Sequence, residues 1–168
     1  MIFVTVGTHE QPFNRLVKFV DKMKEKGIIQ EEVIIQTGFS TYEPKFCKWS
    51  KLFPYQEMVK HVAEARIVIT HGGPSSFIMP LQIGKVPVVV PRKKEYDEHV
   101  NDHQVEFANA VAKKQGNIIV VENIDKLENI ILNYENIIAD MPADVKSNNA
   151  VFNEKFEIIV NELFEKCR

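Results

Sequence analysis

Short apolar runs rich in valine and isoleucine alternate along the chain with stretches in which apolar residues recur at helical spacing. The short runs are typical of strands buried on both faces, and the longer stretches indicate amphipathic helices. The predicted strands are Ile2–Val6, Val33–Gln36, Lys48–Phe53, Arg66–Thr70, Val86–Val90 and Ile118–Val121. The predicted helices comprise one with the apolar stripe Phe13, Leu16, Val17 and Val20, then Tyr55–Ala65, Pro74–Ile83, His99–Gln115 and Ile124–Ile138. This alternation predicts an α/β fold with a doubly wound, Rossmann-like parallel sheet.

The last part of the chain follows the alternating pattern and stands apart from it. A polar bridge, Met141–Ser147, leads into a final predicted helix, Asn148–Lys166. Its apolar stripe consists of Phe152, Phe156, Ile159 and Leu163, at four-, three- and four-residue steps. Such a stripe either packs on the chain's own sheet or docks a partner. We therefore divide the chain into an α/β domain, residues 1–147, and a C-terminal helix, residues 148–168, with both interpretations left open.

Composition and charge narrow the class of protein. The chain has 168 residues, of which 45% are hydrophobic and 26% charged, as in ordinary soluble single domains. A net charge of −2 argues against a nucleic-acid partner. Cys47 and Cys167 are far apart, which favours two free thiols in a reducing cytoplasm. No apolar run is long enough to span a membrane, and because the chain opens on a strand we expect no signal peptide.

The first loop with candidate chemistry follows the first strand, where parallel sheets bind their ligands. Gly7 allows a tight turn, and Thr8 with the N–H groups of the next helix would hold a phosphate. A plain strand-to-helix turn is the alternative, and the dinucleotide pattern G-x-G-x-x-G is absent. His9 and Glu10, at the mouth of this junction, are candidate acid–base groups.

A second loop of this kind follows the fourth strand. Gly72 and Gly73 would let a ligand approach the backbone, and Ser75 and Ser76 offer N–H and hydroxyl donors at the positive end of a helix. Two anion-binding loops at one edge of the sheet indicate a diphosphate. His71 precedes the glycines, and it is either part of the binding site or a buried, hydrogen-bonded histidine.

The loop after the fifth strand adds further polar side chains. Asp102, His103 and Gln104 offer the donors and acceptors that sugar hydroxyls require. A metal site at His99 and His103 is a rival interpretation, although the sequence places no third ligand. The basic run Arg92–Lys94 either attracts an anionic substrate or lipid phosphate, or is a solvated loop.

Taken in order, these segments resemble a known family. They are Gly7–Phe13, Gln36–Gly38, Phe53–Met58, His71–Pro74, Gly84–Pro87, Pro91–Arg92 and Asn101–Gln104. Together they resemble the family 28 glycosyltransferase C-terminal domain, the C-terminal half of a GT-B enzyme. Within it the chain looks most like the small exopolysaccharide and capsule subunits of the PssE type. It is also similar to the catalytic subunit of the dolichol-linked GlcNAc transferase.

The resemblance implies a role for each loop. The donor diphosphate would lie on Gly7, Thr8, Gly72, Gly73, Ser75 and Ser76. The uracil ring would lie on Phe53, Pro54 and Tyr55, whereas Met58 is expected in the core. Asp102, His103 and Gln104 fall where relatives contact the donor sugar. Many relatives bind the ribose with a glutamate at the position of Met79, so that contact would pass to a neighbour such as Gln82.

The implied activity is that of a donor-binding catalytic subunit in an inverting UDP-sugar glycosyltransferase. The resemblance implies galactose or N-acetylglucosamine as the sugar and a lipid-linked saccharide as the acceptor, in exopolysaccharide or capsule synthesis. We expect His9, or else Glu10 or a partner residue, as the base, and neither a metal nor another cofactor, because N–H groups would stabilise the departing UDP.

The implied partner is a membrane-anchored acceptor-binding subunit. It would place the chain in the cytoplasm, peripheral to the inner face of the cell membrane. A non-catalytic UDP-sugar-binding or stabilising subunit is the alternative function. A nucleotide-dependent oxidoreductase is disfavoured, because Gln36 stands where such enzymes end their second strand with an acidic residue.

Overall fold

A six-stranded parallel sheet forms the centre of the computed structural model, which describes residues 1–141 and 154–161. The strands are β1 (Ile2–Thr5), β2 (Val33–Gln36), β3 (Lys48–Ser50), β4 (Ile67–His71), β5 (Val88–Val90) and β6 (Ile119–Val120). Their order is β3-β2-β1-β4-β5-β6, with every pair parallel. The order reverses between β1 and β4, which is where doubly wound sheets bind ligands.

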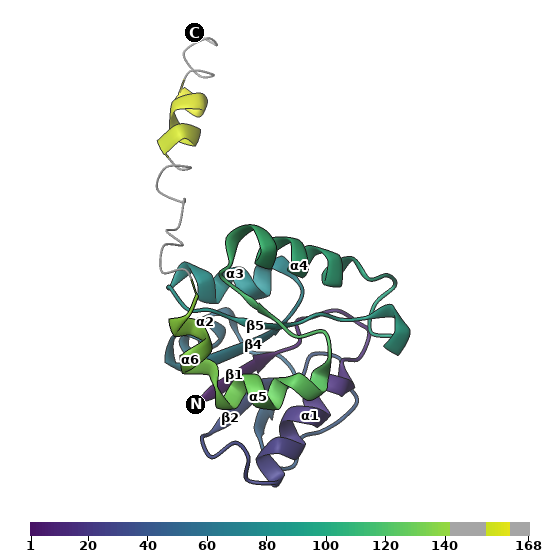
Figure 1. Cartoon of the computed structure of the whole chain (residues 1–168). Coiled ribbons are helices and arrows are strands. Elements are labelled where there is room, and N and C mark those ends of the chain that lie inside the picture. Colours follow the sequence, from purple (N-terminus) through teal and green to yellow (C-terminus); the bar gives the residue numbers. More distant parts are fainter. Residues whose placement is uncertain (142–153, 162–168) are drawn as a thin grey trace.

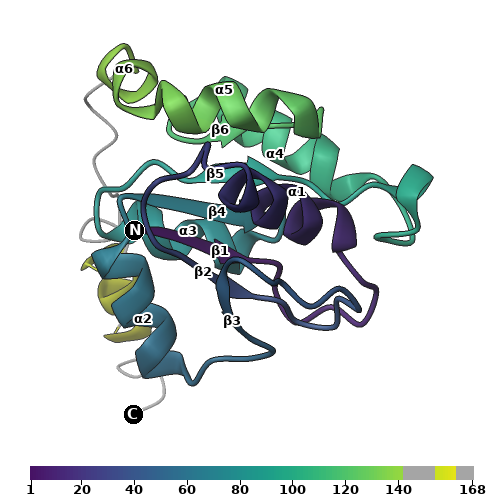
Figure 2. The same cartoon turned by 90° about the horizontal axis from the view of Figure 1, so that it is seen from below.

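Helices cover both faces of this sheet (Figures 1 and 2). One face carries α1 (Asn14–Glu25), α5 (Leu127–Leu132) and α6 (Tyr134–Ala139). The other carries α2 (Tyr55–Glu64), α3 (Pro74–Gln82) and α4 (His103–Gln115). Two 3₁₀ turns, η1 (Lys94–Tyr96) and η2 (Ile124–Lys126), lie in the connections. The predicted doubly wound α/β fold is therefore confirmed.

The period-two geometry of the strands divides the core into two layers. Ile2 and Val4 point from β1 into the cluster beneath α1, whereas Phe3 between them points into the cluster beneath α2. All three side chains are fully buried. Near-continuous apolar strands result because both faces must be covered, and the polar residues that remain are confined to the strand ends.

Some predicted boundaries were wrong. The helix predicted from His99 begins at His103, because Asp97 adopts a left-handed φ of 56° and Asp102 Oδ1 accepts the Lys94 N–H at 2.8 Å. The long helix predicted over Ile124–Ile138 is divided at Asn133. The Asn133 side-chain amide donates to Asn129 O at 3.0 Å and so competes with the backbone.

The predicted C-terminal helix is described only in part. Residues 154–161 are helical, and their apolar side chains Phe156, Ile158 and Ile159 are exposed. The other residues of the predicted helix, including Phe152 and Leu163, lie outside the described residues. The division into 1–147 and 148–168 stays a prediction.

Candidate functional site

His71, the last residue of β4, is the centre of the candidate site. Its Nδ1 accepts the Gly73 N–H at 2.9 Å, and its Nε2 lies 2.9 Å from Ser76 Oγ. Because Nδ1 accepts a hydrogen bond, the neutral ring carries its hydrogen on Nε2 and donates a hydrogen bond to Ser76 Oγ. Burial lowers the pKa of His71 to about 4, and the charge of Arg92 acts in the same direction. His71 is thus a neutral, buried ring that organises the loop after β4.

Two glycines pack directly on this ring. A Cβ added at Gly7, where φ is +74°, would overlap His71 Nε2, and one added at Gly73 would overlap Cε1 of the same ring. The loops after β1 and β4 therefore both pack on the same imidazole, at the neighbouring ring atoms Nε2 and Cε1. The glycines serve this close packing, in addition to the turn that the sequence predicts at Gly7.

Gln104, in the first turn of α4, joins the β4 loop to the β5 loop. Its Oε1 accepts the Gly72 N–H at 3.1 Å and the Arg92 N–H at 3.2 Å, and the side chain is buried. A Cβ on Gly72 would lie 2.8 Å from Gln104 Cβ. The contact of Gln104 with the sugar stays a prediction. The side-chain NH₂ group would make it, because the side-chain oxygen already accepts two backbone N–H groups.

The donors that face outward come from the tips of the same loops. The N–H groups of Gly72 and Gly73 are used internally, by Gln104 and His71. Thr8 is exposed, and Ser75 is exposed in the first turn of α3, where helix N–H groups lack an intrahelical partner. Phosphate binding at this edge would therefore use Thr8, Ser75 and the positive end of α3.

Arg92 is a feature that the sequence did not indicate. Its side chain is fully buried, with Nη1 donating to Gln11 O at 2.7 Å and to Glu98 O at 3.1 Å. Nη2 donates to Val6 O at 2.9 Å. Burial lowers the pKa of Arg92 to about 10, so the group stays charged at neutral pH. The solvated-loop interpretation of Arg92 was wrong, because the buried side chain joins the loops after β1 and β5. Attraction of an anionic substrate by its charge stays a prediction.

Glu98, in the loop after β5, adds further contacts between this loop and α1. Its carboxylate is buried and forms an ion pair with Arg15 of α1 at 2.8 Å. The same carboxylate accepts the Lys93 N–H at 3.1 Å. Two guanidinium groups and one carboxylate therefore fix the β5 loop to α1 and to the loop after β1, which makes the site a rigid junction of three loops.

Three histidines lie together on the outer side of the junction. The His9 and His99 ring centroids are 4.7 Å apart, and those of His99 and His103 are 4.6 Å apart. Burial lowers the pKa of His99, and the charges of His103 and His9 act in the same direction. Among the described residues, no group of three or more His, Cys, Asp or Glu side chains is arranged to hold a metal ion.

His9 and Glu10, the predicted acid–base pair, lie on the loop after β1. His9 Nδ1 accepts the Gln11 N–H at 3.2 Å, so the neutral ring carries its hydrogen on Nε2. Acting as a base would require His9 to release this contact and accept a proton at Nδ1. Glu10 is exposed beside it. Asp102, predicted at the sugar, is exposed and holds the Lys94 N–H.

The predicted uracil segment follows β3. Phe53 is half-buried, with its ring 4.8 Å from that of His61 and 6.2 Å from that of Phe3. Pro54 and Tyr55 are exposed, and Tyr55 retains 74% of its accessible surface. These two residues therefore present the surface on which a base would lie. Met58 and Met79 pack against the core beneath α2, and Gln82 is exposed.

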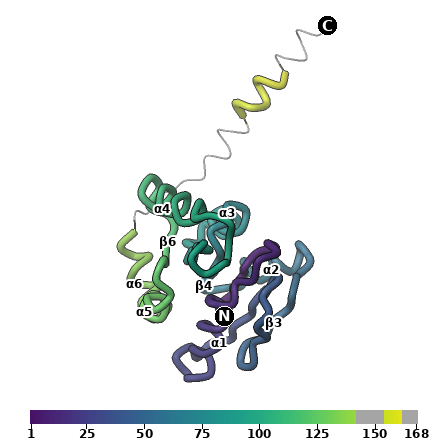
Figure 3. The backbone as a smooth tube through the Cα atoms, turned by 90° about the vertical axis from the view of Figure 1, so that its right-hand side faces the viewer, coloured from purple at the N-terminus to yellow at the C-terminus, as the bar shows by residue number. Residues whose placement is uncertain are grey.

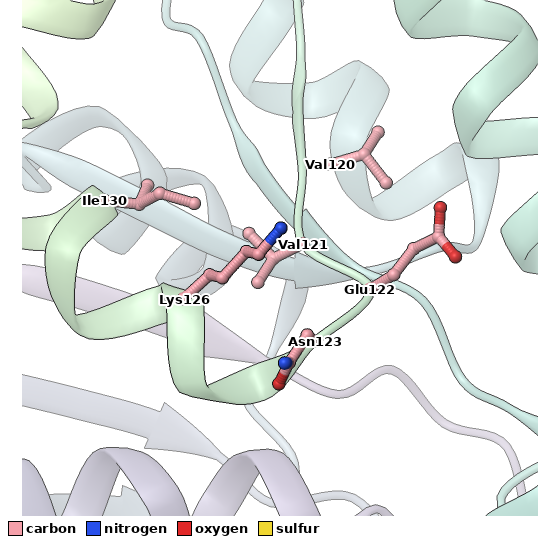
Figure 4. Close-up of a pocket in the computed structure, with 6 residues that line it drawn as sticks. All are labelled: Val120, Val121, Glu122, Asn123, Lys126 and Ile130. Atoms are coloured by element: carbon pink, nitrogen blue, oxygen red, sulfur yellow. The ribbon is translucent and has the colours of Figure 1, made fainter.

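One cavity lies away from these loops (Figure 4). It has a volume of about 350 Å³ and is lined by Val120, Val121, Glu122, Asn123, Lys126 and Ile130. None of the predicted site residues lines it. The junction of the β1, β4 and β5 loops does not coincide with this cavity.

The strand order and the loops at the carboxyl ends of β1, β4 and β5 define a class, the Rossmann-like C-terminal domain of a GT-B glycosyltransferase. The solved glycotransferase of kitacinnamycin shares the fold at 18% identity, with a TM-score of 0.52 over 79% of this chain. The glycosyltransferase SnogD from Streptomyces nogalater is 17% identical over 84% of this chain, with a TM-score of 0.49. This chain covers 34% and 40% of those proteins.

Residues 1–162 match the model of the glycosyltransferase family 28 C-terminal domain, and the chain belongs to this family. No curated protein matches the chain. The predicted family and fold are therefore confirmed. The narrower similarity to PssE-type subunits and to the dolichol-linked GlcNAc transferase stays a prediction. In the part of the chain that the structure describes, no helix is long and apolar enough to cross a bilayer.

Proposed function

We propose that the chain is the donor-binding catalytic subunit of an inverting UDP-sugar glycosyltransferase. The observation that carries the proposal is the junction on His71, where the β1 and β4 loops of a family 28 domain pack on one neutral imidazole. This packing fixes the Gly7–Thr8 turn beside the first turn of α3. A diphosphate spanning the two loops would meet preorganised donors.

The charges at the junction of the β1, β4 and β5 loops favour binding of an anionic donor such as a UDP-sugar. The N-terminus of α3 carries a partial positive charge, and the buried Arg92 guanidinium lies behind the loops. His71 stays neutral at pH 7, so it adds no charge but holds Gly73 and Ser76 in place. Thr8 and Ser75 would supply hydrogen bonds to the phosphates, with no metal or other cofactor.

The reaction requires little covalent chemistry from the protein. The oxygen of an acceptor hydroxyl attacks the anomeric carbon while the bond between that carbon and the diphosphate oxygen breaks. UDP leaves with the bonding electrons, and attack from the opposite face inverts the configuration. His9 is the proposed base for the hydroxyl proton, with Glu10 or a partner residue as the alternative. Tyr55 and Pro54 are proposed to hold the uracil.

The acceptor half is proposed to come from a second chain. This chain covers only about a third of the kitacinnamycin glycotransferase. The proposed partner is a membrane-anchored subunit that binds a lipid-linked saccharide and keeps this chain at the inner face of the cell membrane. Galactose and N-acetylglucosamine are the proposed sugars, in exopolysaccharide or capsule synthesis. The helix within 148–168 is the proposed docking element.

Transfer assays test the proposal. The chain, a candidate acceptor-binding subunit and their mixture are each supplied with a panel of labelled UDP-sugars and a membrane extract that contains acceptor. We expect transfer from one UDP-sugar by the mixture and none by either subunit alone. If the double variant His9→Ala/Glu10→Gln still transfers sugar, the base lies in the partner. UDP-sugar binding without transfer in any mixture would favour the non-catalytic alternative.

A further inference from the structure

A lysine–apolar repeat occupies the edge of the sheet. Residues 45–52, called here the basic edge, repeat a lysine followed by an apolar residue at three-residue steps. The pairs are Lys45-Phe46, Lys48-Trp49 and Lys51-Leu52. All six side chains are exposed, and the three apolar ones keep 48%, 40% and 47% of their accessible surface. Large apolar side chains gathered on a surface in this way indicate a binding face.

The basic edge belongs to β3, the outermost strand, which pairs only with β2 (Figures 2 and 3). Asp21, a buried carboxylate on α1, holds this segment in place. It accepts the N–H groups of Lys45 and Phe46 at 2.9 Å each and that of Cys47 at 3.1 Å. Cys47 points into the core, so its neighbours are fixed with their side chains outward.

Uncompensated positive charge accompanies the apolar side chains. Lys48 forms an ion pair with Glu32, but among the described residues Lys45 and Lys51 form none. The Lys51 ammonium lies 4.7 Å from the centre of the Phe39 ring, which is itself exposed. Glu43 is the one acidic residue between positions 39 and 56. The edge therefore presents exposed cations and exposed apolar side chains along one segment of the sheet edge.

This chemistry matches one class of partner. Lysine is depleted in the cores of protein–protein interfaces, which argues against a protein occupant. At a bilayer surface, by contrast, tryptophan rings lie at the level of the headgroups, while lysine stems lie along apolar surface and the ammonium groups reach anionic phosphates. We propose that the basic edge docks directly on an anionic lipid bilayer, independently of any partner subunit.

The position of the basic edge has a consequence for catalysis, which rests on the proposed function. The edge ends two residues before Pro54 and Tyr55, the proposed uracil surface at the carboxyl end of the sheet. Docking would bring this rim of the donor site to the lipid surface. A saccharide linked to a lipid is held at that surface, so both substrates would meet there.

The single tryptophan makes the proposal directly testable, because Trp49 lies in the basic edge. The full chain is mixed with vesicles of phosphatidylcholine, with or without about a third phosphatidylglycerol, at about 0.1 M salt. No UDP-sugar or acceptor is present, so the result is independent of transferase activity. We expect co-sedimentation with the anionic vesicles only. Trp49 emission should shift to the blue and be quenched by brominated lipids.

Variants separate the basic edge from the remaining surface. Lys45→Gln with Lys51→Gln should weaken binding about 30-fold, since each lysine near an anionic surface contributes about fivefold. Phe46→Ser with Leu52→Ser should weaken it with the charges intact. The matched control, Lys113→Gln with Lys114→Gln at the exposed end of α4, should bind normally. All variants should melt as the unmodified chain does.

Four results would overturn the proposal. One is the absence of binding to anionic vesicles. Another is binding that leaves the emission of Trp49 unchanged, because a different surface would then contact the lipid. The third is equal weakening in the control pair, which would indicate general electrostatic attraction. Loss of partner-subunit binding in the edge variants, with vesicle binding intact, would likewise assign the edge to a protein.

Discussion

His71 and the residues around it show how single side chains determine this site. Both ring nitrogens are engaged, and two glycines are required because any Cβ would enter the space of the ring. A histidine followed by two glycines suggested a phosphate loop in the sequence, with the histidine's role undecided. The structure assigns the ring to loop organisation and leaves Thr8 and Ser75 as the outward donors.

At this scale His9 gives the sharpest test of catalysis. If His9 is the base, His9→Ala should lower turnover by roughly 10²–10⁴-fold and leave UDP affinity nearly unchanged. Steady-state transfer assays and calorimetry with UDP measure the two quantities. Glu10→Gln, on the adjacent exposed residue, is the control and should retain most turnover. Loss of UDP affinity in His9→Ala would instead make His9 a phosphate ligand.

The burial of the Arg92 side chain could not be predicted from the sequence. A basic residue before two lysines suggests a solvated loop, yet the side chain is fully buried. Its partners Val6 and Gln11 lie 86 and 81 residues away in the chain, so no local pattern could indicate them. The Gly7 turn and the α3 start at Pro74, by contrast, follow from local rules for glycine and proline and could be predicted.

At the level of elements, strand and helix types were predictable because both faces of the sheet are covered and each strand is a continuous apolar run. Boundaries were less predictable wherever a side chain added a hydrogen bond to a backbone group. Asn133 divides α5 from α6, and Asp102 holds the turn before α4. Gln104 has a similar role between loops, because its side-chain oxygen accepts one N–H from the loop after β4 and one from the loop after β5.

Gln104→Ala tests this role. Two buried N–H groups would lose their acceptor, so the free energy of unfolding should fall by about 1–3 kcal/mol. UDP affinity should also fall, because the β4 loop loses its anchor. If the amide also contacts the sugar, the affinity for UDP-sugar falls further than that for UDP. Urea unfolding and calorimetry measure these changes, and Glu106→Ala, exposed on the same helix, is the control.

Equal weakening of UDP and UDP-sugar by Gln104→Ala would limit the residue to loop positioning. An unchanged unfolding free energy would contradict the anchoring role itself.

For the whole molecule, the buried histidine predicts a pH dependence of stability. The pKa of His71 is about 4 when folded, compared with ~6.5 in an unfolded chain. Between these values the unfolded chain binds a proton that the folded chain excludes. Stability should therefore fall as the pH drops from about 6.5 towards about 4, by roughly 3 kcal/mol in total.

Urea unfolding at several pH values within this window measures the effect. In His71→Asn the side-chain oxygen can still accept the Gly73 N–H, but the group no longer titrates. The decline of stability between about pH 6.5 and pH 5 should therefore be shallower in this variant. His99, whose pKa is also lowered, is present in both proteins, so only the part of the decline due to His71 should disappear. Parallel curves would show that His71 is not excluded from protonation.

The C-terminal segment gives a second prediction for the whole molecule. The hydrophobic clusters of the described structure draw on residues from Met1 to Ile138. A chain truncated after Ser147 should therefore stay folded and bind UDP, but lose co-purification with the acceptor-binding subunit. Circular dichroism, calorimetry and pull-down measure these outcomes. An unfolded truncated chain would assign residues 148–168 to the core, and retained co-purification would place the docking surface elsewhere.

Calorimetric titration of the chain with UDP, in excess chelator, is the decisive measurement for the proposed donor site. We expect metal-independent binding of one UDP. Binding should weaken at least about tenfold in Gly73→Ala, whose new Cβ overlaps His71. Gly84→Ala, whose Cβ would meet no atom within 4 Å, should lose stability because of the φ of +75° but bind UDP as the unmodified chain does. Failure to bind UDP, a requirement for a divalent metal, or full affinity in Gly73→Ala would contradict the account.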